Sequence, residues 1–461
     1  MGTPLRDIPF ERIAELVAEL DVRGPRYTSY PTVPVWKRGF PPEAFARAVA
    51  ALPPEPIALY LHFPFCRRRC LYCGCNSFIT NRPERIERYV AALERECVRL
   101  GELLPAGRRH ARLHLGGGTP THVPAGRLAR LLDRVLALVP GAPGAERSVE
   151  VDPRITTGEH LSALAARGFT RLSAGVQDLD PAVQRAVRRE YALSELLGFV
   201  ARARAAGFES VNLDLIYGLP RQSEASWRAT LEAILQAKPD RLACFGFAYL
   251  PAQFKHQRVL RAQELPSPAE RIRMLLAAGE VLTSRGYEAI GLDHFALPAD
   301  PLAAARRAGR LWRNFMGYDS VRGLELVGLG SSAISELEGL FVQNETQPER
   351  YAATIEAGTS PIVRGHALDA DDRYRKALIN HLMCNLELGE AALGGSHPIA
   401  PTVPLAELVE KLRPFERHGL VELVSGSCRV TPLGQLFLRN LAMPLDRYLS
   451  EQQGLAFSRT V

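Results

Sequence analysis

The sequence lacks several features that would assign it to a membrane or to an export route. No uninterrupted apolar stretch in its 461 residues reaches the length of a membrane-spanning helix. The first residues contain no apolar signal core, and Arg6 stands where an N-myristoylation site has serine or threonine. We therefore expect a cytoplasmic protein without a membrane partner.

Long basic runs and RNA-binding signatures are also missing, so we expect no nucleic-acid partner. The net charge is nevertheless +7, and most of the cationic residues are arginines. Such an excess fits an acidic small molecule, although an arginine-rich proteome encoded by a GC-rich genome also explains part of it. Hydrophobic residues make up 46% of the chain and charged residues 23%, which is typical of a globular protein.

Cysteine is scarce, with eight residues, and four of them lie within ten positions. This cluster follows the apolar run 57–63 directly, so the thiols come just after a predicted strand. A disulfide interpretation needs an oxidising compartment, and a zinc site needs a second ligand pair, which is not evident. An iron–sulfur cluster is the interpretation that remains. The other explanation is a chance grouping of cysteines, which would leave adjacent thiols open to oxidation. Four further cysteines stand in apolar contexts and are expected to be buried free thiols: Cys97, Cys244, Cys384 and Cys428.

Short apolar runs alternate with helical patterns from residue 57 onward. Strands are predicted at 57–62, 111–115, 148–152, 170–175, 209–215 and 241–247. Helices are predicted at 84–104, 125–138, 158–167, 181–188, 194–206 and 224–237. Buried strands that alternate with helices predict an α/β fold, here a partial (β/α)6 barrel of TIM type.

The chain divides into three predicted parts: an N-terminal arm at 1–50, a catalytic domain at 51–370 with its core barrel at 55–250, and a C-terminal domain at 371–461. The arm has a helix at about 10–20 and an extended segment at 24–32, which either lines a site or packs as a strap. The C-terminal domain is mainly helical and resembles a winged helix, with helices at 371–388 and 405–418 and a hairpin at 419–430. We expect it to pack over the active site.

Polar residues and glycines follow the predicted strands where a barrel carries its chemistry. The second strand ends in Gly116–Pro120, and later strand ends carry Glu150, Gln177 and Asp214. Glycines let a ligand approach the backbone closely. Any one of these residues has an ordinary structural explanation, but four successive strand ends around a cysteine loop favour a binding site.

The spacing Cys66-x3-Cys70-x2-Cys73, with Tyr72 at the aromatic position, resembles the signature of radical S-adenosylmethionine (SAM) enzymes. The resemblance implies that these three cysteines bind one [4Fe–4S] cluster, which leaves one iron open to SAM. Reductive cleavage of SAM then releases a 5′-deoxyadenosyl radical. Cys75 is left without an assigned role.

Motifs along the whole chain resemble one radical SAM family, the oxygen-independent coproporphyrinogen III oxidases, also called dehydrogenases. They lie at 24–32, 62–66, 116–121, 175–178, 214–220, 293–296 and 457–459. The resemblance implies an oxidoreductase of haem and porphyrin biosynthesis, which decarboxylates two propionates of coproporphyrinogen III to vinyls and gives protoporphyrinogen IX. It also implies an anionic tetrapyrrole substrate, a reductant such as flavodoxin or ferredoxin, and a monomer.

The same resemblance implies two bound SAM molecules. The first would contact Cys66, Cys70, Cys73, Gly117, Glu150, Gln177, Arg189, Asp214 and Ala248. The second would lie near Tyr60, Tyr72, Gly118, Thr119, Phe315 and Ile334. Tyr60, Glu150, Phe315, Met316 and Ile334 are the expected catalytic residues, with Met316 standing where the family usually has glutamine.

Two alternative functions remain at this point. One is another radical SAM enzyme on the same scaffold, such as a methyltransferase or a haem-ring-opening enzyme, which is favoured by Met316 and by Leu297, where the family commonly has a basic residue. The other is a haem chaperone or an iron–sulfur redox protein that does not cleave SAM, and the polar strand ends argue against it.

Overall fold

The computed structural model describes residues 7–390, 399–424, 426–452 and 457–460. Its main feature is a 13-stranded sheet in the order β1-β17-β16-β15-β14-β2-β5-β6-β7-β8-β9-β11-β10. Six successive parallel strands form its centre: β2 (Ile57–Phe63), β5 (His110–Gly117), β6 (Gly141–Val151), β7 (Arg171–Gln177), β8 (Ser210–Tyr217) and β9 (Arg241–Gly246). The predicted strands and the α/β class are confirmed.

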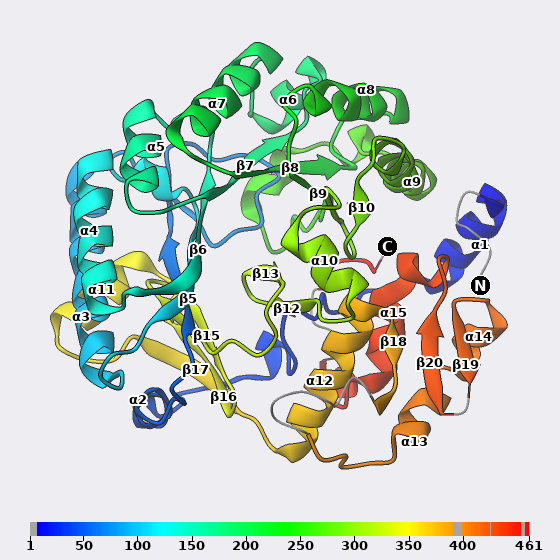
Figure 1. Ribbon diagram of the computed structural model, residues 1–461. Coiled ribbons are helices and arrows are strands. Elements are labelled where there is room, and N and C mark those ends of the chain that lie inside the picture. The colour runs from blue at the N-terminus through cyan, green and yellow to red at the C-terminus, as the bar shows by residue number, and fades with distance from the viewer. Residues whose placement is uncertain (1–6, 391–398, 425, 453–456, 461) are drawn as a thin grey trace.

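Helices cover the outer face of these parallel strands (Figure 1). They are α3 (Pro83–Leu103), α4 (Ala125–Leu138), α5 (Gly158–Ala165), α6 (Pro181–Val187), α7 (Leu193–Ala206) and α8 (Glu224–Leu235), as the sequence predicts. Aliphatic side chains of strands and helices, such as Leu115, Val149 and Leu131, form one buried core between the two layers. The inner face is left to polar and aromatic side chains, so every parallel strand has one face for stability and one for a site.

Short strands extend the sheet at both edges, and the sequence did not predict them. On one side, β14 (Leu326–Leu329) runs parallel to β2 and is followed by antiparallel β15 (Ile334–Leu337), β16 (Leu340–Asn344), β17 (Ile362–Ala367) and β1 (Lys37–Arg38). On the other side, β11 (His294–Ala296) and β10 (Glu288–Ala289) continue from β9. Helices α2 (Pro42–Ala50), α9 (Pro268–Ser284), α10 (Pro301–Arg307) and α11 (Pro348–Glu356) and the hairpin β12 (Trp312–Asn314)–β13 (Gly317–Asp319) complete this part.

The C-terminal elements form a second buried core, which includes part of the N-terminal arm. They are α12 (Ala370–Asn385), β18 (Glu387–Leu388), α13 (Leu405–Glu410), α14 (Arg413–Arg417), β19 (Val421–Val424), β20 (Ser427–Val430) and α15 (Leu438–Ala442). Helix α1 (Phe10–Leu20) lies beside them (Figure 1) and contributes Ile13, Leu16 and Val17 to their core. The hairpin is confirmed, but the single helix expected up to residue 418 is wrong. It is two short helices, because Pro414 cannot continue the hydrogen-bond ladder of α13.

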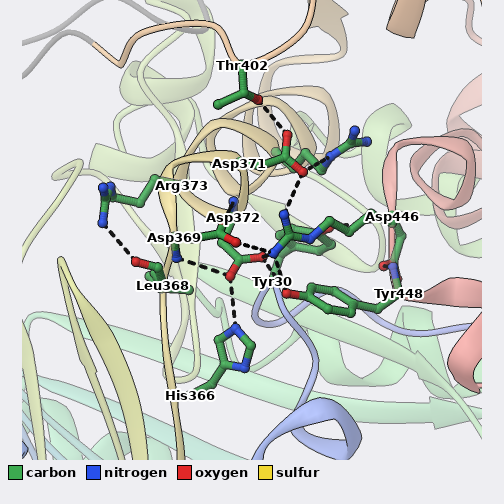
Figure 2. Close-up of polar contacts among 12 residues, drawn as sticks. Tyr30, His366, Leu368, Asp369, Asp371, Asp372, Arg373, Thr402, Asp446 and Tyr448 are labelled. Carbon is green, nitrogen blue, oxygen red and sulfur yellow. Dashed lines mark hydrogen bonds and ion pairs between the residues drawn. The ribbon is translucent and has the colours of Figure 1, made fainter.

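The start of α12 joins the arm, the sheet and the C-terminal segment (Figure 2). Asp372, whose side chain is 1% exposed, accepts hydrogen bonds from His366 of β17 (2.9 Å) and Tyr448 (3.0 Å). Arg447 pairs with Asp371 at 2.9 Å, and its main-chain N–H donates to the Tyr30 hydroxyl at 3.1 Å. The arm is therefore held to the C-terminal elements by polar contacts as well as by its apolar helix. None of the described helices is long and apolar enough to cross a membrane.

Candidate active site

The cysteine loop leaves the sheet at the C-terminal end of β2. Two short strands, β3 (Phe65–Cys66) and β4 (Phe78–Ile79), pair in parallel and hold the two ends of the loop together. Cys70 is buried, Cys66 and Cys73 are half-buried, Cys75 is exposed, and all four are free thiols. All four line one cavity of about 1250 Å³ at the carboxyl ends of the parallel strands.

The surroundings of these thiols fit a multi-iron cluster. Burial raises the pKa of Cys66 to about 11, so its thiolate needs a cationic partner such as iron. A hydrogen bond with Cys75 is the largest of the causes that lower the pKa of Cys73 to about 5. No three His, Cys, Asp or Glu side chains of the described residues converge on one metal ion. Three free thiols on the wall of one cavity suit an iron–sulfur cluster, which cysteine thiolates hold.

Glu150 projects from the end of β6 into the same cavity. Its carboxylate accepts a hydrogen bond from the Gly117 N–H at 3.0 Å and lies 3.4 Å from Nε2 of His114. Burial raises the pKa of Glu150, but the hydrogen bond and charge of His114 and the Gly117 N–H together hold it below its usual value. The side chain is 46% exposed, and this exposure is to the cavity that it lines. An ionised carboxylate is therefore available to a cationic ligand.

Arg189 lies beside the cysteine loop, 6% exposed, and its NH1 is 3.5 Å from the Cys70 sulfur. Its partner is Asp152, at 3.2 Å, which also forms a 2.6 Å pair with Arg154. The sequence predicted Arg189, but it did not predict Asp152 or Arg154 as site residues. Asp152 lies two positions after Glu150, just past the end of β6. A carboxylate at the end of a strand was the signal in the sequence that could have marked Asp152 as a site residue.

Asp214 and Gln177 complete the strand-end group predicted from sequence. Asp214 accepts hydrogen bonds from Ser173 at 2.8 Å and from Asn212 at 2.7 Å. Burial, followed by the nearby charge of Glu150, raises the pKa of Asp214 to about 6. Gln177 has a φ of 74°, a left-handed conformation that ends β7 and sets its side chain at the cavity wall.

A second cavity of about 850 Å³ adjoins the first, and the two share Tyr72, Glu150, Gln177 and Asp214 in their walls. The hairpin β12–β13 brings Phe315 and Met316 to this central cavity, where Arg26 of the arm and Ala248 also lie. At the amino-terminal ends of the strands, three ion pairs lie in the wall of the cavity or beside it: Arg112–Asp319, Arg171–Glu146 and Arg241–Asp300. These arginines are already neutralised.

The remaining predicted residues are only partly brought together. Gly117, Gly118 and Thr119 line the cysteine cavity, but Tyr60 and Ile334 do not line either cavity. Tyr60 donates or accepts a 2.9 Å hydrogen bond with His62 and stacks on His114, with 5.9 Å between ring centroids. Ile334 packs with Phe315 against a separate apolar cluster. Tyr60 is thus connected to Glu150 through His114, which sequence reasoning missed.

Comparison with known proteins agrees with this geometry. The model of the Radical SAM superfamily matches residues 60–234, and that of the HemN C-terminal domain matches residues 368–437. The oxygen-independent coproporphyrinogen III oxidase of Escherichia coli (strain K12) is 39% identical over 447 residues, which are 97% of this chain and 98% of that protein. The corresponding protein of Pseudomonas aeruginosa is 39% identical over 453 residues, with the same coverage. The solved structure of coproporphyrinogen III oxidase (HemN) from Escherichia coli aligns with a TM-score of 0.86 and 39% identity, over 92% of this chain and 98% of that one.

Proposed function

The chain belongs to the oxygen-independent coproporphyrinogen III oxidases of the radical SAM superfamily, and from this we propose which of its residues carry out the reaction. It is an oxidoreductase of haem biosynthesis that acts on a tetrapyrrole. In this reaction each of two propionates loses a β-hydrogen atom, CO2 and one electron and becomes a vinyl group. The similarity spans both the arm and the C-terminal elements, which argues against the alternative functions that Met316 suggested.

Cys66, Cys70 and Cys73 would hold the [4Fe–4S] cluster that the family requires, since they are free thiols on one cavity wall. When bound, the cluster and SAM supply the carbon radical that removes the β-hydrogen. The nearby Arg189 and Arg154 guanidinium groups stabilise negative charge on the Cys70 sulfur and so offset part of the cost of burying these thiolates. Exposed Arg67 and Arg68 on the same loop would attract an acidic reductant such as flavodoxin or ferredoxin.

Glu150 and Asp214 would anchor the SAM bound at the cluster. Both are carboxylates aimed into the cavity, and SAM carries a sulfonium and an ammonium group. Ionised acceptors form stronger hydrogen bonds to cationic and hydroxyl donors than neutral ones do. Gly117, Gln177 and Arg189 would complete this site, with Ala248 on the side of the central cavity.

A second SAM molecule would occupy the boundary of the two cavities, near Tyr72, Thr119 and Phe315. Met316, unlike the glutamine of the family, offers no amide to this ligand. Its backbone N–H is fixed by Asn314 at 2.8 Å, so the path of the hairpin does not depend on the side chain. Gly118 also belongs to this proposed site, and Tyr60 and Ile334 would act from just behind it.

The N-terminal arm would close the central cavity over the substrate. Arg26 lies in the cavity wall on an arm that is attached to the C-terminal elements. A guanidinium at this position matches a propionate carboxylate, and closure would exclude water from a carbon radical. We further propose that the enzyme acts as a monomer in the cytoplasm, where a reducing environment keeps its eight free cysteines reduced.

The observation that carries this proposal is the convergence of three cysteines and two carboxylates on one cavity of a family member. An anaerobic assay with reductant, SAM and coproporphyrinogen III tests it. We expect two CO2 and protoporphyrinogen IX for each substrate, with formation of 5′-deoxyadenosine. A methylated or ring-opened tetrapyrrole, or no cleavage of SAM, would contradict the proposal.

A further inference from the structure

A third cavity of about 330 Å³ lies beside the central one, and its wall is unusually cationic. Six arginines and one carboxylate, Asp293, line it. It shares Arg26, Phe247, Arg313 and Phe457 with the central cavity, so the two adjoin. The four clustered cysteines line the first cavity, and Cys73 and Cys75 also line the central one, but none of them lines this third cavity.

Three of the seven charged side chains in this wall have identified structural partners. Arg439 bonds the main-chain carbonyls of Pro25 and Ser458, among others, and thereby fixes the arm to the C-terminal residues. Arg459 pairs with Asp21 at 2.5 Å. Asp293, the one carboxylate in the wall, pairs with the His294 ring at 2.6 Å. Among the described residues, these contacts leave the exposed Arg23 and Arg26 of the arm, and two half-buried guanidinium groups, without a carboxylate at ion-pair distance.

Arg271 and Arg313 are those two groups. Each gives one hydrogen bond to a main-chain carbonyl, Arg271 to Phe247 at 3.2 Å and Arg313 to Arg26 at 2.9 Å. Within the part of the chain that the structure describes, neither pairs with a carboxylate at ion-pair distance, and the buried Nε of each lacks a hydrogen-bond partner. Buried donors without acceptors are uncommon in proteins and call for an explanation, and an anion beside these two would supply one. The arginines beneath the central cavity differ in that each has a carboxylate at ion-pair distance.

The local structure keeps space for Arg271. A Cβ added at Gly218, whose φ is +82°, would lie 3.0 Å from its Nε. Arg271 also stands in the first turn of α9, where the helix dipole disfavours a cation and favours an anion. The Arg271 cation at the start of α9 is therefore electrostatically unfavourable by itself, and a bound anion would offset this repulsion.

We propose that this cavity is a carboxylate subsite, in which Arg271 and Arg313 bind a propionate of the tetrapyrrole that does not react. The proposal rests on the proposed function. Two of the four propionates survive the reaction, so a subsite for a surviving carboxylate holds substrate and product alike. With one carboxylate held in a cavity that none of the four clustered cysteines lines, the macrocycle would span the central cavity and present its reacting edge to the cysteine loop. The positive charge of this cavity also affects Arg439, because burial and the charges of Arg26 and Arg313 lower its pKa to about 9.

Anaerobic binding of stable porphyrins to the cluster-loaded enzyme, measured by fluorescence quenching, tests this subsite without turnover. We expect Arg271→Gln to weaken binding of coproporphyrin III and of protoporphyrin IX by roughly tenfold or more, as for the loss of a charge-assisted hydrogen bond. Binding of coproporphyrin III tetramethyl ester, which has no free carboxylate, should not change. Arg271→Lys should recover part of the affinity, because it keeps the charge without the planar fork.

Arg285→Gln is the matched control, since it removes the same charge from the far end of α9, where Arg285 is 57% exposed and pairs with Glu232. It should bind every porphyrin as the parent does. Arg313→Gln, which changes a different element, should weaken porphyrin binding as Arg271→Gln does. It keeps the proposal testable if Arg271→Gln folds poorly. Equal losses for the ester and the free acid, or a loss confined to coproporphyrin III, would overturn the proposal. So would a loss of SAM binding with porphyrin affinity intact. A parent enzyme that makes no protoporphyrinogen would instead contradict the proposed function.

Discussion

Asp214 offers a direct test of whether this site lowers the free energy of unfolding in order to bind SAM. Burial, followed by the charge of Glu150, raises the pKa of Asp214 from 3.8 to about 6. Protonated Asp214 therefore makes its full contribution to the free energy of unfolding below pH 3.8, and this contribution is lost as the pH rises through about 6. At about 1.4 kcal/mol for each pH unit, ionised Asp214 lowers the free energy of unfolding at pH 8 by roughly 3 kcal/mol.

The variant Asp214→Asn removes the charge and keeps the shape. Its amide oxygen can still accept from Asn212, and its NH2 can donate to Ser173, whose hydroxyl already accepts from Asn212 at 2.8 Å. We expect the cluster-free protein to gain up to about 3 kcal/mol in unfolding free energy at pH 8 and nothing at pH 4. SAM should bind the variant more weakly. In the parent, SAM affinity should fall by up to about tenfold for each pH unit below 6, and in the variant this part of the pH dependence should vanish.

Urea unfolding at pH 4 and pH 8, together with anaerobic calorimetry of SAM binding between pH 5 and pH 8, measures both effects. Asp133→Asn is a suitable control, because Asp133 is 59% exposed and pairs with Arg167 at the surface. It should change the stability by no more than about 0.5 kcal/mol. If Asp214→Asn destabilises the protein at pH 8, or binds SAM as tightly as the parent, the reasoning about this carboxylate is wrong.

Three further predictions concern the cluster, the second cofactor and the arm. Cys70→Ala should abolish iron binding and activity, while Cys75→Ala should keep the cluster; iron analysis of both proteins checks this, and full iron in Cys70→Ala would contradict it. Met316→Gln should tighten binding of a second SAM by about tenfold, the equivalent of one neutral hydrogen bond, and leave binding of the first SAM unchanged. The number of SAM molecules bound at equilibrium by the parent and by the variant tests this, and one bound molecule in each would refute it. Arg26→Gln should let SAM cleavage continue while decarboxylation falls, so the ratio of 5′-deoxyadenosine to CO2 should rise; a constant ratio would make the arm a packing element only.

The parallel half of the fold could be predicted because its strands and helices have distinct periodicities and ordinary lengths. The strands β14 to β17 could not, since they are four to six residues long and the region around Gly328–Ser335 resembles a loop. Their stability comes from non-local contacts that no local pattern encodes. Buried Glu96 of α3 accepts hydrogen bonds from the Gly330 N–H and from Asn344 and Tyr351, which fixes this region to the barrel.

The arm shows a different limit of sequence reasoning. Its helix could be predicted with the observed bounds, Phe10–Leu20, but its partner could not. Tyr27 donates to Asp446 at 3.1 Å and lies in the C-terminal core, so the arm is a structural part of that core as well as a wall of the cavity. Removing the whole arm would therefore disturb folding, whereas a change at Arg26 alone isolates its role toward the substrate.

The residues that would bind cofactor and those that would bind substrate differ in how far sequence predicts them. Cys66 to Cys73 follow β2, Glu150 lies near the end of β6 and Asp214 in the second half of β8, so the rule that a parallel sheet carries its site toward the carboxyl ends of its strands brings them together. Arg271 and Arg313 come from a helix and a hairpin outside the repeating units, and no spacing relates them. Arg271 nevertheless carries a local signal, a cation in the first turn of a well-capped helix, which helix electrostatics disfavours. Departures of this kind from local preference occur where function opposes stability, and here the departure points to the anion that the site would bind.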